Sequence, residues 1–232
     1  MTSLIAHSTR SKTKSVLLHN CTIGRSNTPL ITGVSLDATA GEITHIKGPN
    51  GVGKSTLLET VIGEVEPLAG KRDNKLPRYG TRSHQFFFGY MPARVHPLPS
   101  LTINQWVNGI GDGLGVEKRK IESLWRRLNG RALPKSRLEH LSSGNLRKAL
   151  AINAFAIQRK MLILDEPFEE IDTTGREVIG DLISEQATGG AAVLVVSHTP
   201  LPQVNRIVEL HEDMSSSRVP AVSYTHLTLP TI

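Results

Sequence analysis

A glycine-rich turn carries the clearest chemical signal in this 232-residue sequence. The phosphate-binding pattern GxxxxGK[ST] is matched in full by Gly48-Pro49-Asn50-Gly51-Val52-Gly53-Lys54-Ser55, and Thr56 follows it. Glycines let the backbone curl so that N–H groups face phosphate oxygens, and a helix beginning at Lys54 adds the positive end of its dipole. Lys54 can then reach the β- and γ-phosphates, and the Ser55 hydroxyl can bind Mg²⁺. An apolar strand before the turn and an amphipathic helix after it favour this interpretation over a turn without a ligand.

Two carboxylates follow a short apolar run at residues 161–164. Parallel sheets bind their ligands at the carboxyl ends of the strands, which is where Asp165 and Glu166 would lie. We expect Asp165 to hold Mg²⁺ through water, and Glu166 to orient and deprotonate the water that attacks the γ-phosphate. The alternative is a solvated pair that closes a strand, and the phosphate loop in the same chain favours the catalytic role.

A third apolar run, residues 193–196, ends in Ser197 and His198. The same arrangement would bring His198 to the γ-phosphate, where it could sense the loss of that group. A lone histidine is more often a structural residue. This assignment therefore depends on the two preceding motifs.

Small polar residues precede another amphipathic stretch, in the segment Leu141-Ser142-Ser143-Gly144-Asn145. Exposed N–H groups at the start of a helix would form a second anion site here. An ordinary serine N-cap would explain the segment equally well. Taken alone, the segment leaves both interpretations open.

These motifs require a scaffold in which several strands end at one edge. Strand, helix and strand are expected at 161–164, about 175–186, and 192–196, which favours an α/β fold with a parallel sheet covered on both faces. Hydrophobic patterning predicts further strands at 15–18, 31–38, 42–47 and 86–91, helices from Lys54, within 101–138 and at 145–158, and an irregular excursion at 66–83.

Composition limits the possible classes of protein. The chain is 38% apolar and 21% charged, and no apolar run approaches the roughly 18 residues that a membrane span needs. Cys21 is the only cysteine, so no intrachain disulfide can form, and the polar start lacks the apolar core of a secretory signal. The net charge of +6 is spread widely without interleaved aromatic residues, so no nucleic-acid partner is expected.

Taken together, the motifs resemble the ATPase domain of ABC proteins over about residues 15–210, with Asp172 at the position of that family's D-loop aspartate. The resemblance implies a P-loop NTPase core with a mostly parallel sheet, an N-terminal antiparallel β region and a small helical subdomain. It also implies ATP and Mg²⁺ as cofactors and two ATPase copies paired head to tail. Each ATP would lie between the phosphate loop of one copy and residues 142–145 of the other. A transmembrane permease subunit, docked near residues 87–106, would hold this cytoplasmic chain at the inner face of the membrane.

Several positions depart from the family pattern. The signature LSGGQ has Ser143 for a glycine and Asn145 for the glutamine. Ile23 or a neighbour stands where an aromatic residue would stack on adenine. Residues 91–93 lack the glutamine that links nucleotide state to the membrane partner, which puts coupling and turnover rate in doubt. The retained hydrolytic residues are Lys54, Asp165, Glu166 and His198.

One domain is expected at residues 1–221, with a core at about 15–95 and 141–213 and the helical subdomain at about 96–140. Residues 222–232 begin with Val-Ser-Tyr-Thr-His-Leu, which resembles a translated sequencing adapter, and we exclude them from the expected fold. A genuine flexible tail is the alternative.

The stretches 165–172 and 197–201 are similar to ATPases of the haem-exporter type, although the absent glutamine departs from them. Two functions besides transport stay open. One is a soluble ABC ATPase in DNA maintenance, translation or cofactor assembly. The other is a regulatory module that binds nucleotide and hydrolyses it weakly.

Overall fold

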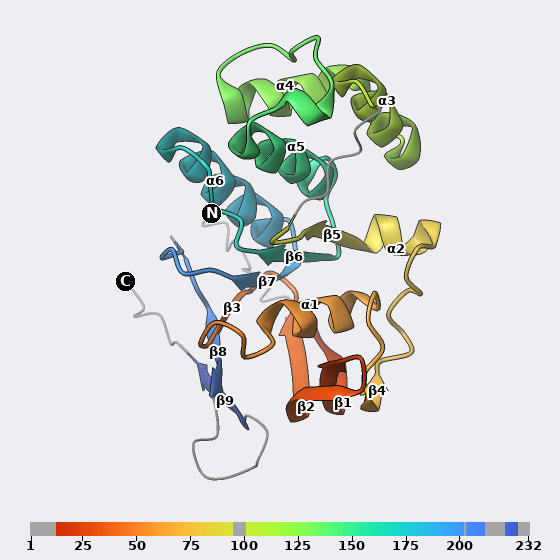
Figure 1. Ribbon diagram of the computed structural model, residues 1–232, viewed down its shortest axis with the longest axis vertical. Coiled ribbons are helices and arrows are strands. Elements are labelled where there is room, and N and C mark those ends of the chain that lie inside the picture. Colours follow the sequence, from red (N-terminus) through yellow and green to blue (C-terminus); the bar gives the residue numbers. More distant parts are fainter. Residues whose placement is uncertain (1–12, 95–100, 202, 212–220, 227–232) are drawn as a thin grey trace, which may run out of the picture.

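The computed structural model describes residues 13–94, 101–201, 203–211 and 221–226. Two sheets form within these residues, one of six strands and one of three (Figure 1). Helices α5 (Ser143–Phe155) and α6 (Thr173–Thr188) lie on one side of the larger sheet, while α1 (Lys54–Ile62) lies on the other side, between the larger and the smaller sheet. The predicted α/β class with a parallel sheet covered on both faces is confirmed.

The larger sheet has five parallel strands, with a sixth antiparallel to them at one edge. In spatial order the strands are β5 (Phe88–Met91), β6 (Met161–Asp165), β7 (Ala192–Val196), β3 (Ile43–Lys47), β8 (Arg206–His211) and β9 (Ala221–His226). Every residue of β6 and β7 is buried, as continuous apolar runs predict. Because parallel strands end at the same edge, the residues that follow β3, β6 and β7 meet there.

The hydrophobic core has two halves, one on each face of the larger sheet, and alternate side chains of β6 point into different halves. Leu162 and Leu164 pack against the helices on one face, whereas Ile163 packs against α1 and the smaller sheet on the other. The helices flanking the sheet are α1 (Lys54–Ile62), α5 (Ser143–Phe155) and α6 (Thr173–Thr188). A sheet buried on both faces holds the ends of its strands rigidly, which is what a catalytic site requires.

The smaller sheet is antiparallel and comprises β1 (Lys14–Arg25), β2 (Thr28–Thr39) and β4 (Ala69–Arg72). Strand β4 lies in the segment expected to be irregular, so that expectation was wrong at these residues. Strand β4 pairs with β1 because the two backbones lie close together, and its sequence has no alternating apolar pattern. A Cβ at Gly70 would lie 2.3 Å from the Asn20 carbonyl oxygen, and three of the four β4 residues are exposed.

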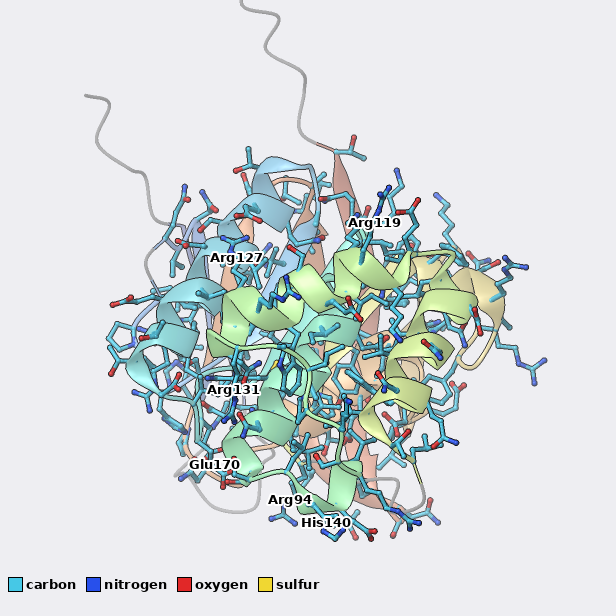
Figure 2. All side chains as sticks on the ribbon, turned by 90° about the horizontal axis from the view of Figure 1, so that it is seen from above. Arg94, Arg119, Arg127, Arg131, His140 and Glu170 are labelled. Atoms are coloured by element: carbon cyan, nitrogen blue, oxygen red, sulfur yellow. The ribbon has the colours of Figure 1, made fainter. Side chains whose placement is uncertain are left out.

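The helical region contains α3 (Ile103–Leu114) and α4 (Lys118–Asn129). Helix α4 buries a stripe formed by Ile121, Trp125 and Leu128, and the expectation of helices within 101–138 is confirmed. Arg127 on α4 (Figure 2) donates to the Glu185 carboxylate of α6 at 2.7 and 3.1 Å, which connects this region to the core. Residues 96–100 of the expected subdomain lie outside the described residues.

The expected strand at 86–91 was wrong in its first two residues, which end the short helix α2 (Arg82–Phe87). Thr81 caps α2 by accepting a hydrogen bond from the His84 backbone N–H at 3.2 Å. The His84 ring lies 3.0 Å from the Ile62 carbonyl oxygen. These contacts hold the aromatic residues 86 and 87 in a helix despite their preference for strands.

Leaving the carboxyl-terminal segment out of the fold was wrong for residues 222–226. Strand β9 pairs with β8 from Ala221 against His211 to His226 against Arg206. Ladder hydrogen bonds join backbone groups, so this pairing does not depend on the origin of the sequence. The adapter origin of residues 222–232 stays a prediction, and residues 227–232 lie outside the described part of the chain.

Candidate active site

The phosphate loop joins β3 to α1 at the carboxyl edge of the larger sheet. Gly53 precedes α1 with φ of 106°, a left-handed conformation that side chains rarely adopt, and a Cβ there would press on Leu30 and Ile31 at 3.2 Å. In the described structure no side chain caps α1 and its first turn carries no acidic residue. The free N–H groups and the helix dipole therefore face the loop, as an anion site requires.

The Lys54 ammonium folds back across this loop. Its Nζ atom donates to the carbonyl oxygens of Gly48 and Pro49, each at 2.8 Å, and the residue is 9% exposed. An ammonium has three donors, so two brace the loop and one is left for a phosphate oxygen. The chain thus places a buried positive charge at the centre of the phosphate loop.

Ser55 and Asp165, the two residues predicted to hold Mg²⁺, lie side by side. Asp165 ends β6, is 2% exposed, and accepts a hydrogen bond from the Ser55 side chain. Burial raises the pKa of Asp165 above its ordinary value, and the Ser55 hydrogen bond opposes that rise. A hydroxyl and a buried carboxylate are the hard oxygen ligands that Mg²⁺ prefers, so this pair fits the ion.

Glu166 has an unusual backbone conformation for a non-glycine residue, with φ of 50°. Such a conformation costs on the order of 1–3 kcal/mol and occurs at functional sites. Its backbone N–H donates to the Val196 carbonyl at 2.8 Å, which anchors the residue to the end of β7. The strained backbone thereby turns the carboxylate along the edge of the sheet.

His198 meets both this carboxylate and the phosphate loop. Its backbone N–H donates to Glu166 Oε2 at 3.1 Å, and its ring Nε2 lies 3.5 Å from Oε1. The same Nε2 lies 3.1 Å from Asn50 Oδ1. The histidine thus connects Glu166 to the turn that would hold the γ-phosphate.

These groups share one cleft of about 340 Å³. It brings together five of the predicted catalytic and metal residues from three segments of the chain: Lys54, Ser55, Asp165, Glu166 and His198. A cation, a metal-binding pair and a carboxylate held by a histidine are the parts needed to hydrolyse a polyphosphate.

The segment from Ser142 to Asn145 does not line this cleft. Ser142 caps α5 by accepting a hydrogen bond from the Asn145 backbone N–H at 3.3 Å, so the simple N-cap interpretation is confirmed. Gly144 lies against the Glu170 carbonyl, 2.6 Å from where a Cβ would be, which explains a glycine there. A role for residues 142–145 in binding nucleotide stays a prediction.

Asp172 also lies outside the cleft. Its Oδ1 accepts from the Gly175 backbone N–H at 2.8 Å, which caps α6, and its Oδ2 accepts from Lys148 Nζ at 2.9 Å. The Lys148 hydrogen bond is the main cause that lowers the pKa of Asp172. Within one chain this carboxylate has a structural role, and its contact with nucleotide stays a prediction.

Replacing Asp172 by alanine is expected to lower the free energy of unfolding by about 2–3 kcal/mol, because α6 loses its cap and the buried Lys148 loses its partner. Asparagine keeps the cap and should cost about 1 kcal/mol. The ion-pair contribution should be complete above the ordinary carboxyl pKa of 3.8 and lost as the pH falls through the lowered folded value. Urea unfolding of both variants tests this, and equal losses would contradict a contribution from the cap.

Arg147, which no sequence motif singled out, joins helix α5 to residues 92–93 and 165–166 at the carboxyl edge of the larger sheet. Its Nη1 donates to the carbonyls of Pro92 and Ala93, both at 2.7 Å, and its Nη2 donates to the carbonyls of Asp165 and Glu166. The available signal was a cation beside the apolar stripe of α5, and the residue is 3% exposed. Arg147 thus connects the segment that lacks the glutamine to the backbone of the two residues that carry the catalytic carboxylates.

The ABC transporter family model matches residues 31–169, more than half of the chain. The chain belongs to the ABC transporter family. The predicted membership of the family is therefore confirmed.

Curated relatives and solved structures agree with this assignment. The zinc import ATP-binding protein ZnuC of Photorhabdus laumondii is 29% identical over 91% of this chain and 80% of its own length. ZnuC of Ruegeria sp. is 31% identical over 87% of this chain and 74% of its own length. A solved ATP-binding subunit of an ABC transporter superposes with a TM-score of 0.75 at 25% identity, covering 84% of this chain and 85% of that one.

This ABC protein is accordingly an ATP-binding and ATP-hydrolysing subunit of the transporter type, as predicted. Among the residues that the structure describes, no helix is both long and apolar enough to span a bilayer. The similarity of residues 165–172 and 197–201 to haem-exporter ATPases stays a prediction.

Proposed function

We propose that this chain binds MgATP in the cleft at the phosphate loop and hydrolyses it to drive a membrane permease subunit. The observation that carries the proposal is the convergence of Lys54, Asp165, Glu166 and His198 in one cleft. These are the side chains that in-line attack of water on a γ-phosphate uses together with Mg²⁺ and backbone N–H groups.

Each side chain has a role that follows from its position. The N–H groups of the α1 first turn and Lys54 neutralise phosphate oxygens. Ser55 and Asp165 would hold Mg²⁺, which supplies charge neutralisation between the β- and γ-phosphates when bound. Glu166 accepts the proton of the attacking water, and His198 keeps the carboxylate directed at the γ-phosphate.

A second copy of the chain would complete the site. Ser142 and Ser143 are exposed at the start of α5, where helix N–H groups favour an anion. They do not reach the cleft of their own chain, so only a head-to-tail partner could bring them to its nucleotide. The two chains would close around MgATP and separate again after hydrolysis. This motion would be transmitted to the permease subunit.

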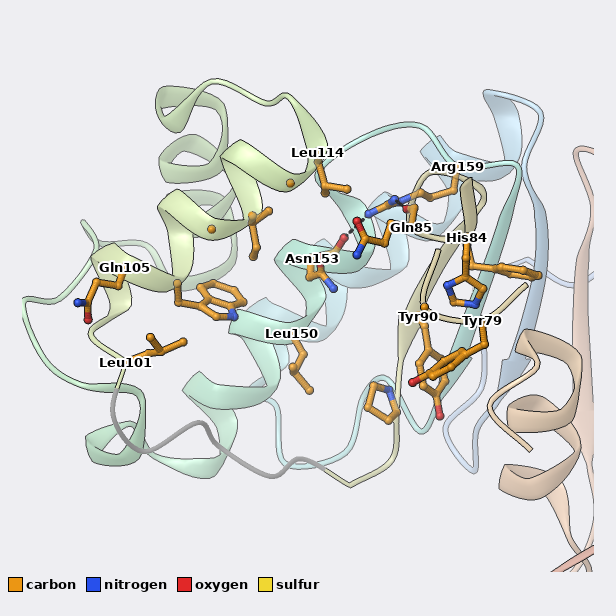
Figure 3. Close-up of a pocket in the computed structure, with 17 residues that line it drawn as sticks. Tyr79, His84, Gln85, Tyr90, Leu101, Gln105, Leu114, Leu150, Asn153 and Arg159 are labelled. Carbon is orange, nitrogen blue, oxygen red and sulfur yellow. Dashed lines mark hydrogen bonds between the residues drawn. The ribbon is translucent and has the colours of Figure 1, made fainter. Parts of the chain in front are cut away.

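A larger cleft of about 550 Å³ offers a docking place for the permease (Figure 3). It lies between α3 and the β5 edge, and its walls carry Tyr79, Tyr90, Trp106, Leu114 and Leu150. Part of the expected docking segment 87–106, namely 95–100, lies outside the described residues. Docking here would place the chain on the cytoplasmic, inner face of the cell membrane. The membrane subunit would determine which substrate is transported.

Filling this larger cleft should block docking without affecting the nucleotide site. Gly109 lines the cleft, and a Cβ at this residue would meet no atom within 4 Å. Gly109→Trp should therefore fold, keep its ATP affinity, and fail to co-purify with the permease subunit when the two are co-expressed. Asn108→Trp, on an exposed neighbouring position that does not line the cleft, is the matched control. Normal co-purification of Gly109→Trp would contradict docking at this place.

A further inference from the structure

The cleft at the phosphate loop offers no free aromatic side chain to stack on a nucleobase. None of the described residues that line it is Phe, Tyr or Trp, and the one aromatic ring among them, the His198 imidazole, is engaged by Glu166 and Asn50. Ile23, which stands where the family resemblance places a stacking aromatic, is completely buried and cannot touch a ligand. The nucleotide's base therefore needs another partner on the β1–β2 hairpin, where Leu30 contributes the apolar lining.

Arg25 lies on this hairpin two residues beyond Ile23, at the end of β1. Its Nε donates to Thr56 Oγ1 at 3.3 Å, and Thr56 lines the cleft directly after Ser55. Its Nη2 pairs with the Glu59 carboxylate one turn further along α1. Two contacts from different nitrogen atoms of one planar group hold the guanidinium in a defined orientation beside the cleft.

The surroundings of Arg25 suit a base better than a phosphate. Its side chain is 56% exposed, so part of the group is open to a ligand. Its charge is already paired with Glu59, and a second anion there would be repelled by that carboxylate. A guanidinium plane can stack on a nucleobase as an aromatic ring does, and this contact does not require a second anion beside Glu59.

We propose that the guanidinium of Arg25 is the stacking platform for the nucleobase, in place of the aromatic residue absent at Ile23. This inference rests on the proposed nucleotide site, and it concerns only the base and not the phosphates. It makes Arg25 a specificity-determining residue for nucleotides over inorganic polyphosphates.

The test compares two ligands that differ only in whether a nucleoside is present. Arg25→Ala should weaken MgATP binding about 5- to 150-fold, the range expected for one stacked base, and leave magnesium tripolyphosphate binding within about two-fold of wild type. Arg25→Lys keeps the charge but loses the plane, so it should behave like Arg25→Ala. Lys14→Ala is the control, because Lys14 is an exposed cation on the same strand, paired with Asp37.

Three results would overturn the proposal. Equal weakening of both ligands, or rescue by Arg25→Lys, would show that Arg25 acts as a cation on phosphate. An unchanged MgATP affinity would show that Arg25 only ties the hairpin to α1. The tripolyphosphate titration also reports whether each variant is folded. Wild-type protein that binds neither ligand would instead contradict the nucleotide site itself.

Discussion

Replacing Glu166 by glutamine is expected to leave MgATP affinity within about two-fold of wild type and to lower the rate of phosphate release about 10²- to 10⁴-fold. The amide keeps the shape of the side chain and can still meet the His198 backbone N–H through its oxygen. It cannot accept the proton of the attacking water. Nucleotide titration and a steady-state phosphate assay on the same preparation measure the two quantities separately.

Glu170→Gln provides the matched control for this variant. Glu170 is an exposed carboxylate four residues further along, and it does not line the cleft. Its substitution removes the same charge from the same turn and should leave turnover near wild type. Phosphate release by Glu166→Gln at the wild-type rate would show that another group is the base.

The second large effect is expected for Lys54→Ala, which should weaken MgATP binding about 10- to 100-fold and abolish measurable turnover. A charged hydrogen bond to phosphate contributes about 1.5–3 kcal/mol. The loss also leaves the Gly48 and Pro49 carbonyls without their donor, so the loop is held less firmly. Displacement of a fluorescent nucleotide would measure the affinity.

Lys47→Ala controls for the loss of a positive charge near the loop. Lys47 ends β3 just before the loop and is exposed, and it does not line the cleft. This variant should bind MgATP as wild type does. If Lys54→Ala also bound normally, the ammonium would not contact the phosphates.

The parts that sequence predicted well depend on contiguous residues. The phosphate loop needs a particular backbone path between a strand and a helix, and its glycines and Lys54 specify that path. The run before Asp165 needs only to be apolar and of strand length. In both cases the local sequence motif contains the residues that the folded site uses. The motif alone is therefore enough to locate the site.

The parts that sequence missed arise from contacts between distant segments. Arg147 reaches carbonyls 55 residues away at Pro92, and Arg25 reaches Thr56, 31 residues away. A single cation on a helix or hairpin gives no sign of such a target. Strand β4 was missed for the same reason, because its four exposed or half-buried residues pair through the backbone.

Helix starts were displaced by about two residues where polar side chains determine them. Helix α5 begins at Ser143 and not at Asn145, because the Ser142 hydroxyl caps it, and α6 begins at Thr173 under the Asp172 cap. Apolar periodicity reports only the buried face of a helix. The first turn contributes little to that face, so the pattern alone cannot locate it.

Calorimetric titration of the purified wild-type chain with ATP, once with Mg²⁺ present and once with a chelator, tests the central claim most directly. We expect saturable binding of one nucleotide per chain with Mg²⁺, and clearly weaker binding without it, because Ser55 and Asp165 would hold the ion. The absence of saturable heat with MgATP would contradict the claim that the loop from Gly48 to Ser55 holds a nucleotide.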